Sequence, residues 1–499
     1  MYYKNKEAIP TSYLRKQIST EKYKISTDTE FSKECNKYLI NECNKKDINI
    51  KIVEFLVQHG TDINKECFIR GITSIFKACS NGNKTVVKYL IEHGADINKE
   101  DHFFKTPIFS ACKSGNESLV KYLVELGVDI FTTDINGNSP IFSACRSGNE
   151  SLVRYLIELG ADINKESVIS FVPIFSACES GNESLVRYLV ELGADINKEN
   201  AFLETPLYYA CYHGDESLVK YLVELGTDIN KIDRYGNTPL FSACLGGKEV
   251  IVKYLVEQGL DINKENRHGE TPLFKACRNK NEKIAKYLVE QGVNINKEND
   301  EGETPLFRAC FDGNKPIIKY LVEHGADINK ENNRRETPLF IACSRVNESV
   351  VKYLVEHGAD INKENNKNET PLFIACLKEN ESIVKYLVEQ GANVNKENNK
   401  SETPLFIACL KENESIVKYL VEQGANIEKE NKMGDTPLFV ACAKNNESIV
   451  KYLVEQGVNV NKKNKMGETP LTYTHAYHRI NKKIGRYLVK HGAINYEYF

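Results

Sequence analysis

The fold is decided by one stretch of sequence, which reads TPIFSACKSGNESLVKYLVELGVDIFTTD from Thr106 to Asp134. Its opening Thr-Pro pair suits a helix start, because threonine caps helix ends and proline fits the first helical position. Apolar residues recur at helical spacing before Gly115 and after Asn116, so the stretch predicts two short helices joined there. Gly127 ends the second helix, and an extended polar turn follows it.

The same pattern recurs every 33 residues along most of the chain. The Thr-Pro position, or a variant of it, repeats without slip from Thr73 to Thr469, which makes thirteen registered units. A degenerate unit precedes them, because His59 to Asn64 copies the ending of later units, and the total is about fourteen. Helices this short are unstable alone and gain stability by stacking on their neighbours, so the repeats predict one continuous core.

The repeated unit resembles the ankyrin repeat in its period, its Thr-Pro-Leu opening and its Gly-Ala-Asp-Ile-Asn ending, over roughly residues 39–499. The resemblance implies an all-α solenoid, with short β-turn hairpins, of about 14 stacked helix–turn–helix units. One position departs from the family. The usual histidine after Thr-Pro-Leu is Phe or Tyr in twelve units and Thr472 in the last. The hydrogen bonds that this histidine makes between repeats must therefore be missing or replaced by ring packing.

Departures from the pattern at both ends predict capping segments. Residues 1–38 carry no clear repeat and are expected to form a flexible or partly helical arm. A degenerate N-terminal capping repeat and its loop follow at 39–72, and twelve regular repeats span 73–468. Residues 469–499 replace apolar positions of the repeat with polar ones, which suits a terminal repeat with a polar outer face.

The composition is that of a folded, nearly neutral protein, with 41% hydrophobic residues, 27% charged residues and a formal net charge of -3. Binding to nucleic acid requires a basic excess, so we expect no nucleic-acid partner. No apolar run approaches the ~20 residues of a membrane span. The N-terminus also lacks the apolar stretch of a signal peptide. We therefore expect an intracellular protein, cytoplasmic by default, with the nucleus left open.

Twelve of the 15 cysteines form a ladder of period 33 from Cys79 to Cys442. Stacked helices lie about 8–10 Å apart, whereas a disulfide needs Cα atoms within about 7 Å. No Cys-x-x-Cys pair is present to bind zinc. The ladder therefore predicts small buried core residues in a reducing compartment. His475 and His478 lie three residues apart without an evident third ligand, so we expect neither a metal nor a cofactor.

A binding surface is best sought where the units differ at exposed positions, because the shared positions hold the fold. The resemblance implies that the turn tips before Thr-Pro and the exposed face of the first helix line a concave binding surface. The tips are mostly polar, but three early ones are bulky and apolar, and the first helix after them adds aromatic residues. We expect partner-binding residues to be His102, Phe103, Phe104, Val168, Ile169, Phe171, Phe202, Leu203, Tyr209, Tyr212 and His213.

Two interpretations of these early tips remain open. An exposed patch rich in aromatic residues is typical of a protein interface. Alternatively, the tips fold against one another and only stabilise the turns. In the first case, changes at Phe103, Phe171 and Phe202 abolish binding without affecting stability, and in the second case they disturb folding.

We expect a non-enzymatic scaffold that binds other proteins and is itself a monomeric array, because nearly all residues belong to the repeat. No phosphate-binding, zinc-protease or serine-hydrolase motif is present. One alternative is a structural spacer, favoured by the identical stretches 369–393 and 402–426. The other is an adaptor that recruits an enzyme such as a ubiquitin ligase through a docking segment in 1–38 or 493–499.

Overall fold

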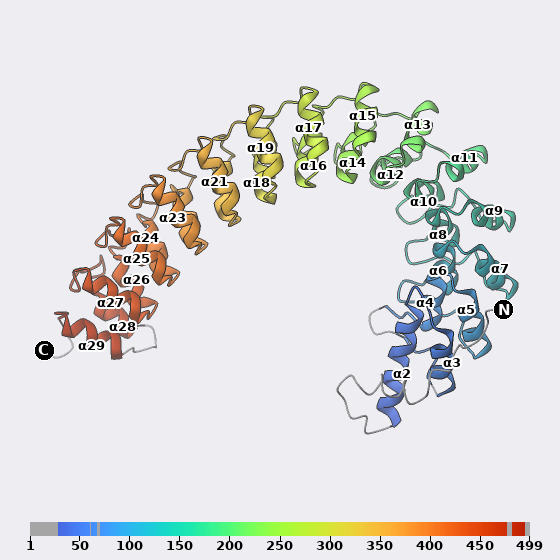
Figure 1. The fold of residues 1–499 in the computed structure, drawn as a ribbon, viewed down its shortest axis with the longest axis horizontal. Helices are drawn as coiled ribbons and strands as arrows, with labels where there is room; N and C mark the ends of the chain where they lie inside the picture. Colours follow the sequence, from blue (N-terminus) through green and yellow to red (C-terminus); the bar gives the residue numbers. More distant parts are fainter. Residues whose placement is uncertain (1–27, 60, 67–69, 477–481, 495–499) are drawn as a thin grey trace, which may run out of the picture. The chain divides into compact units, whose positions relative to one another are not determined.

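The computed structural model describes residues 28–59, 61–66, 70–476 and 482–494, and Figure 1 colours the chain from blue to red. The chain divides into two compact units, Met1–Arg234 and Tyr235–Phe499. In each unit, short helices follow one another in pairs, and the described residues contain helices and turns but no strand. These helix pairs confirm the expected all-α solenoid.

Within each of the two units, the first helix of a repeat packs mainly on the first helices of the neighbouring repeats. In the first unit these helices are α4 (Ser74–Ser80), α6 (Pro107–Ser114), α8 (Pro140–Ser147), α10 (Pro173–Ser180) and α12 (Pro206–His213). In the second unit they are α14 (Pro239–Gly246), α16 (Pro272–Arg278), α18 (Pro305–Asp312), α20 (Pro338–Ser344), α22 (Pro371–Leu377), α24 (Pro404–Leu410), α26 (Pro437–Ala443) and α28 (Pro470–Ala476).

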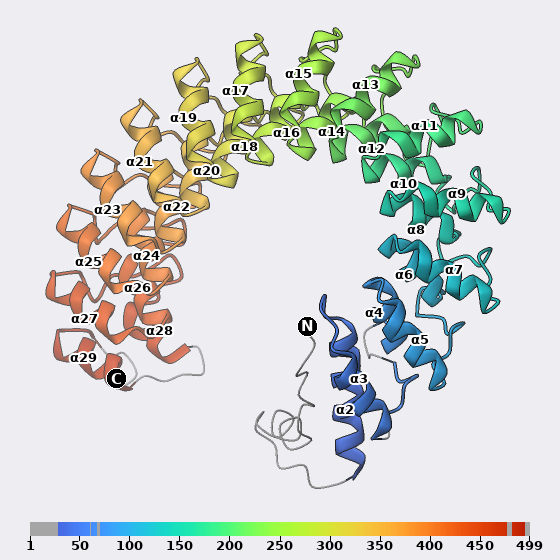
Figure 2. The ribbon, with the colours of Figure 1, turned by 45° about the vertical axis from the view of Figure 1, so that its right-hand side comes forward.

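The second helices form another layer, which Figure 2 shows most clearly in the second unit. In the first unit they are α5 (Lys84–Glu92), α7 (Glu117–Glu125), α9 (Glu150–Glu158), α11 (Glu183–Glu191) and α13 (Glu216–Glu224). In the second unit they are α15 (Glu249–Glu257), α17 (Glu282–Glu290), α19 (Lys315–Glu323), α21 (Glu348–Glu356), α23 (Glu381–Glu389), α25 (Glu414–Glu422), α27 (Glu447–Glu455) and α29 (Lys482–Lys490).

The helix boundaries lie where the repeat predicts them. Thr106 is extended, with φ −95° and ψ 166°, and the proline after it begins α6. Gly115 ends α6 in the left-handed conformation at φ 73°, which glycine adopts without steric cost. Asn116 then caps α7 by accepting a 3.0 Å hydrogen bond from the backbone N–H of Leu119. The amide nitrogen of the same asparagine donates to the carbonyl of Gly82 at 2.7 Å, which ties this junction to the previous repeat.

The core is built from the apolar positions of both helices. Cys112, Leu119 and Leu123 are fully buried, and their equivalents in the other repeats are nearly so. The twelve cysteines of the ladder are free and buried, which confirms that the ladder is core packing. Burial raises the pKa of the Cys112 thiol above its ordinary value, so this group stays protonated and apolar in character.

Ring packing replaces the hydrogen bonds that histidine makes in similar repeats. Phe109 is only 3% exposed, and the buried hydroxyl of Thr106 has no hydrogen-bond partner. The same buried hydroxyl lacks a partner at Thr73, Thr205, Thr238, Thr271, Thr304, Thr337 and Thr436. Tyr208 is different, because its hydroxyl donates to the carbonyl of Lys231 in the following loop at 2.7 Å.

The loop after each second helix ends in a tight turn whose tip precedes the next Thr-Pro position. In one such turn, the backbone N–H of Asp134 donates to the carbonyl of Asn138 at 2.9 Å. The buried carboxylate of Asp134 accepts the N–H groups of Asn136 and Asn138, each at 2.9 Å. These contacts hold the tip rigidly without a regular strand.

In the part of the chain that the structure describes, two helices precede the regular repeats. Helix α2 (Asp28–Cys43) packs on α3 (Ile50–Gln58) and α4 through Cys35, Leu39 and Cys43, which share one buried face. The expected boundary at residue 38 therefore lies inside α2. Most of the expected arm, residues 1–27, lies outside the described residues, as do His478 and the side chain of His475. Within the described part of the chain, no helix is both long enough and apolar enough to cross a membrane.

Candidate partner-binding surface

Large apolar side chains are exposed on four consecutive turn tips of the first unit. We call this surface the tip strip. It consists of Phe103 (43% exposed), Phe104 (52%), Ile135 (51%), Val168 (75%), Ile169 (40%) and Leu203 (41%). A group of large exposed apolar side chains on adjoining turns is a candidate contact surface for a partner.

Backbone hydrogen bonds between successive turns align the tip strip. The N–H of Ile135 donates to the carbonyl of Phe103 at 2.8 Å. The N–H of Ala201 donates in the same way to the carbonyl of Ile169 at 2.9 Å. Each of these tips is thus fixed against the one before it by its backbone.

Two residues of the tip strip have a left-handed backbone. Phe104 and Leu203 both have φ of 61°. The equivalent residue is Gly137 or Gly236 in neighbouring turns, with φ of 77° and 80°. A side chain larger than glycine costs about 1–2 kcal/mol in this conformation. Ser170, Arg335, Asn368 and Ser401 occupy the same position in other turns with φ of 54° to 60°, so this conformation is common to the turns.

The structure corrects the prediction for Phe171 and Tyr209. Phe171 is only 7% exposed, because its ring stacks on Phe175 with 4.6 Å between the ring centroids. Tyr209 is half-buried and packs edge-on against Phe171 at 5.2 Å, while its hydroxyl donates to Glu204 at 2.8 Å. The rings of these two residues pack against each other, as the alternative interpretation proposes, and this packing stabilises the turns.

The remaining predicted residues lie at the edges of the tip strip. His102 is exposed, and its Nε2 atom lies 3.9 Å from a carboxylate oxygen of Glu66. Phe202 is half-buried beneath the guanidinium of Arg234, which lies 5.7 Å from the ring centroid. Tyr212 and His213 are exposed at the C-terminal end of α12, where their rings contact each other edge-on. The residues predicted to bind a partner therefore include some that are exposed and others that pack against neighbouring side chains.

The sequence provided only weak evidence that two residues, Ile135 of the tip strip and Phe131, are exposed and apolar. Ile135 is a single apolar residue in a polar turn, and only the hydrogen bond to Phe103 shows that it belongs to the tip strip. Phe131 is 59% exposed and begins a Phe-Thr-Thr segment where most repeats have Asn-Lys-Glu. That motif elsewhere links repeats, for example through the 2.7 Å ion pair of Lys99 with Glu66. The replacement of the Asn-Lys-Glu motif by Phe131-Thr-Thr is the feature of the sequence that could have predicted this exposed residue.

The surface offers contacts between side chains and no evident reactive group. Within the described residues, no group of three or more His, Cys, Asp or Glu side chains could hold a metal ion. The tip strip is apolar, and some of the charged groups beside it form ion pairs. For example, the ammonium group of Lys105 lies 3.4 Å from the buried carboxylate of Asp134. Such a surface can bury an apolar face of another molecule.

Comparison with known proteins gives a consistent result. A crystal structure of the human ASB11 ankyrin repeat domain is similar to this chain, with 28% identity and a TM-score of 0.41, and covers 45% of this chain and 99% of that one. No curated protein matches the chain significantly. A second model, for ankyrin repeats in many copies, matches residues 174–223. A model for ankyrin repeats in three copies matches residues 39–134, 78–167, 207–299, 251–332, 291–365, 341–431 and 405–498. Because these matches extend over well more than half of its length, the chain belongs to the ankyrin repeat family.

Proposed function

We propose that this chain is a non-enzymatic protein-interaction array, and that a partner protein binds the tip strip of its first unit. Ankyrin repeats are generally protein–protein interaction modules, and arrays of them are typically scaffolds without enzymatic activity. The partner would contact the tip strip and the adjoining end of α12, where Tyr212 and His213 are exposed.

One observation carries this proposal: six large apolar side chains are exposed on four consecutive turn tips of the first unit. Apolar surface in contact with water is unfavourable for the isolated chain. Burial of these side chains against a partner would remove that surface from water and stabilise the complex.

A capture experiment with matched variants tests the proposal. Three tip-strip residues, Phe103, Val168 and Leu203, are changed to serine in the full chain, which is then immobilised and exposed to extract from the source cells. We expect proteins retained by the wild type to be lost from this variant, because the apolar contact is removed. Retained proteins are identified by mass spectrometry, and circular dichroism verifies that the variant is folded.

The control variant changes Leu126, Leu159 and Leu192 to serine. These residues are 42%, 39% and 44% exposed and follow α7, α9 and α11 in the same unit, away from the turn tips. The control variant should retain the partners of the wild type. Equal retention by the tip-strip variant, or equal loss from both variants, would contradict the assignment of the tip strip.

A further inference from the structure

A small cavity lies between two successive loops of the first unit. Its volume is about 190 Å³, whereas a single water molecule needs only about 10–15 Å³. All of its lining residues lie on loops and none belongs to the tip strip; they are Asn197, Glu199, Thr205, Gly226, Asp228 and Lys231. The cavity therefore has room for one side chain or a small molecule, at a place apart from the exposed face of the first helices.

The matching loops of the second unit show which chemical group fits between such loops. There the carboxamide of Asn329 accepts the N–H of Asp360 at 2.7 Å and donates to the carbonyl of Gly358 at 3.0 Å. A carboxamide suits this place because it carries an acceptor and a donor on one carbon, so it satisfies both backbone groups at once. The corresponding residues at the cavity, four repeats earlier, are Asn197, Asp228 and Gly226.

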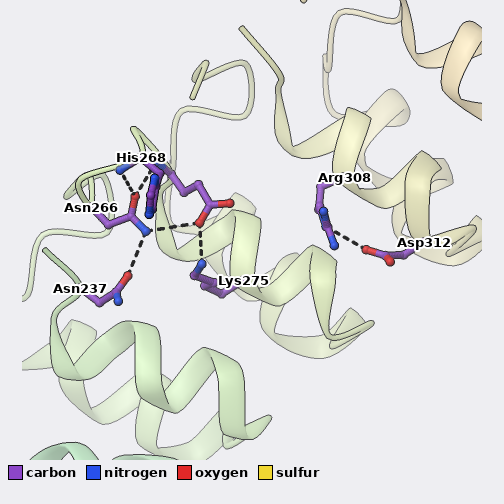
Figure 3. Close-up of polar contacts among 7 residues, drawn as sticks. Asn237, Asn266, His268, Lys275, Arg308 and Asp312 are labelled. Carbon is purple, nitrogen blue, oxygen red and sulfur yellow. Dashed lines mark hydrogen bonds and ion pairs between the residues drawn. The ribbon is translucent and has the colours of Figure 1, made fainter. Parts of the chain in front are cut away.

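Figure 3 shows another carboxamide that joins neighbouring turns in the second unit. The side-chain oxygen of Asn266 accepts the N–H of His268 at 2.9 Å, and its nitrogen donates to the side-chain oxygen of Asn237 at 3.0 Å. The same nitrogen lies 3.3 Å from a carboxylate oxygen of Glu270, which also accepts a hydrogen bond from Lys275. Carboxamides are thus the groups with which this chain connects its own turns.

At the cavity the two backbone groups are in place, but the carboxamide bridge is not made. The loop has the same conformation in both units, since Gly226 and Gly358 have φ of 85° and 92°. Asn197 is exposed, and no described residue makes a hydrogen bond to the carbonyl of Gly226 or to the N–H of Asp228. An acceptor and a donor therefore stand at the cavity with the spacing that a carboxamide fits.

A buried hydroxyl adds a third group that can contact a ligand. Thr205 lines the cavity and is 3% exposed, and its hydroxyl has no hydrogen-bond partner among the described residues. The charges at the cavity are already engaged, because Lys231 pairs with Glu199 at 2.6 Å and the carboxylate of Asp228 accepts the N–H of Asn230 at 2.8 Å. The cavity thus favours a neutral polar group over an anion, which the carboxylate of Asp228 would repel.

We propose that this cavity binds a primary carboxamide, such as the side chain of a glutamine or asparagine of another molecule. The carboxamide oxygen accepts the N–H of Asp228 and its nitrogen donates to the carbonyl of Gly226, as Asn329 does in the second unit. The hydroxyl of Thr205 contacts the same group. Leu225, which is 42% exposed and adjoins Gly226, offers an apolar contact for the atoms that carry the carboxamide. The site stands or fails independently of the partner proposed for the tip strip.

Titration of the full chain with small probes, followed by NMR, tests this proposal. Isotope labelling of aspartate alone reports the backbone N–H of Asp228, whose resonance should shift when a ligand oxygen accepts it. Acetyl-glutamine methylamide should bind with a dissociation constant on the order of 1 mM, which is ordinary for a probe of this size. Acetyl-glutamate methylamide and acetyl-lysine methylamide should bind at least about tenfold more weakly, because the first lacks the donor and the second lacks the acceptor.

Propionamide separates the two possible sources of the carboxamide. It carries the same group on an ethyl chain and has no peptide bonds. Weaker binding of propionamide than of the glutamine probe supports recognition of a peptide side chain, and equal binding supports recognition of a small amide.

The bridged loop of the second unit provides a control in the same sample. The N–H of Asp360 should not respond to the glutamine probe, because Asn329 already occupies its bridge. Asn329→Ala removes that carboxamide and should make the N–H of Asp360 respond as that of Asp228 does. The surroundings match, since Thr337 repeats the unpaired buried hydroxyl of Thr205.

Two threonine variants test the contact with the buried hydroxyl. Thr205→Val should weaken binding of the glutamine probe by about threefold or more, as expected for the loss of one neutral hydrogen bond. The variant should fold, because Val172 occupies this position before α10. Thr238→Val removes an equally unpaired hydroxyl that does not line the cavity, and should leave binding unchanged.

Three results would overturn the proposal. The first is the absence of a shift at Asp228, and the second is equal affinity for the glutamine, glutamate and lysine probes. The third is a response at Asp228 that appears only in Asn197→Ala, which would mean that Asn197 itself makes the bridge in solution.

Discussion

At the scale of single residues, the tip strip combines exposure with backbone strain. Phe104 and Leu203 each occupy a turn position that is glycine in many repeats, and the turn adopts the same left-handed conformation in all of them. The backbone conformation is therefore imposed by the turn and not chosen by the side chain. Ser170 and Arg335 adopt the same conformation at this position, so only their apolar exposure distinguishes Phe104 and Leu203.

Replacing Phe104 with glycine should stabilise the chain, whereas replacing Phe103 with glycine should not. Only Phe104 has a positive φ, so only its replacement relieves the left-handed strain of about 1–2 kcal/mol. Both replacements make the unfolded chain more flexible, at a cost of about 0.5–1 kcal/mol. Urea unfolding of the two variants should differ by about 1–2 kcal/mol in favour of Phe104→Gly. Equal stability of the two variants would show that the turn is not strained.

At the scale of the helix, the departure from the usual histidine changes how each first helix begins. The hydroxyl of the Thr-Pro threonine is buried without a partner in many repeats, so these threonines act through their extended backbone and not as side-chain caps. Val172 demonstrates the point, because α10 begins after it in the same extended conformation without any hydroxyl. The proline and the extended residue before it are sufficient to start the helix.

Thr271→Val should therefore stabilise the chain by about 1 kcal/mol, because an unpaired hydroxyl is replaced by a methyl group of similar shape. Thr403→Val is the matched control. The hydroxyl of Thr403 accepts a hydrogen bond from the N–H of Phe406 at 3.4 Å, so its removal should bring no gain. Urea unfolding of the full chain measures both changes. A loss of stability in Thr271→Val similar to that in Thr403→Val would mean that the hydroxyl is paired in solution.

At the scale of the whole molecule, an asparagine bridge connects successive loops in some repeats and is missing from others. In the second unit, the side chain of Asn329 accepts the N–H of Asp360 at 2.7 Å and donates to the carbonyl of Gly358 at 3.0 Å. The same two-way bridge recurs from Asn296, Asn362 and Asn395. In the first unit Asn64 makes the same bridge to Gly94 and Asp96. The side chains of Asn164 and Asn197 lie at the matching position, are exposed and make no such bridge.

Hydrogen exchange should reveal this difference between repeats. The amide of Asp360 is held by Asn329, whereas the matching amide of Asp195 has no bridge from Asn164, so Asp195 should exchange faster. Asn329→Ala should accelerate exchange at Asp360 and leave the amides of distant repeats unchanged. Mass spectrometry of peptides from both loops measures these rates. Equal protection of the two amides in the wild type would contradict a difference in loop connection.

Much of the fold was predictable because it is local. The glycine that ends α6 and the asparagine that caps α7 act on their own backbone, so sequence spacing locates them. The cysteine ladder was equally predictable, since a fixed period forces each thiol into the same buried layer. The surface was predictable only in part. Phe103 and Phe171 occupy similar turns in the sequence, yet one is exposed and the other is covered by Phe175 and Tyr209.

The sequence by itself determined the repeat, its two helices and the region where the early turns become apolar. The tertiary structure alone decided which apolar side chains remain exposed, that Ile135 lies beside Phe103, and that Glu270 has a cation while Glu336 has none. The physical reason is that the exposure of an apolar side chain and the pairing of a charge depend on neighbouring side chains. These come from adjacent repeats and from other elements of the same repeat. A periodic sequence specifies which positions meet, but the particular side chains that meet decide whether an apolar group is covered and a charge is neutralised.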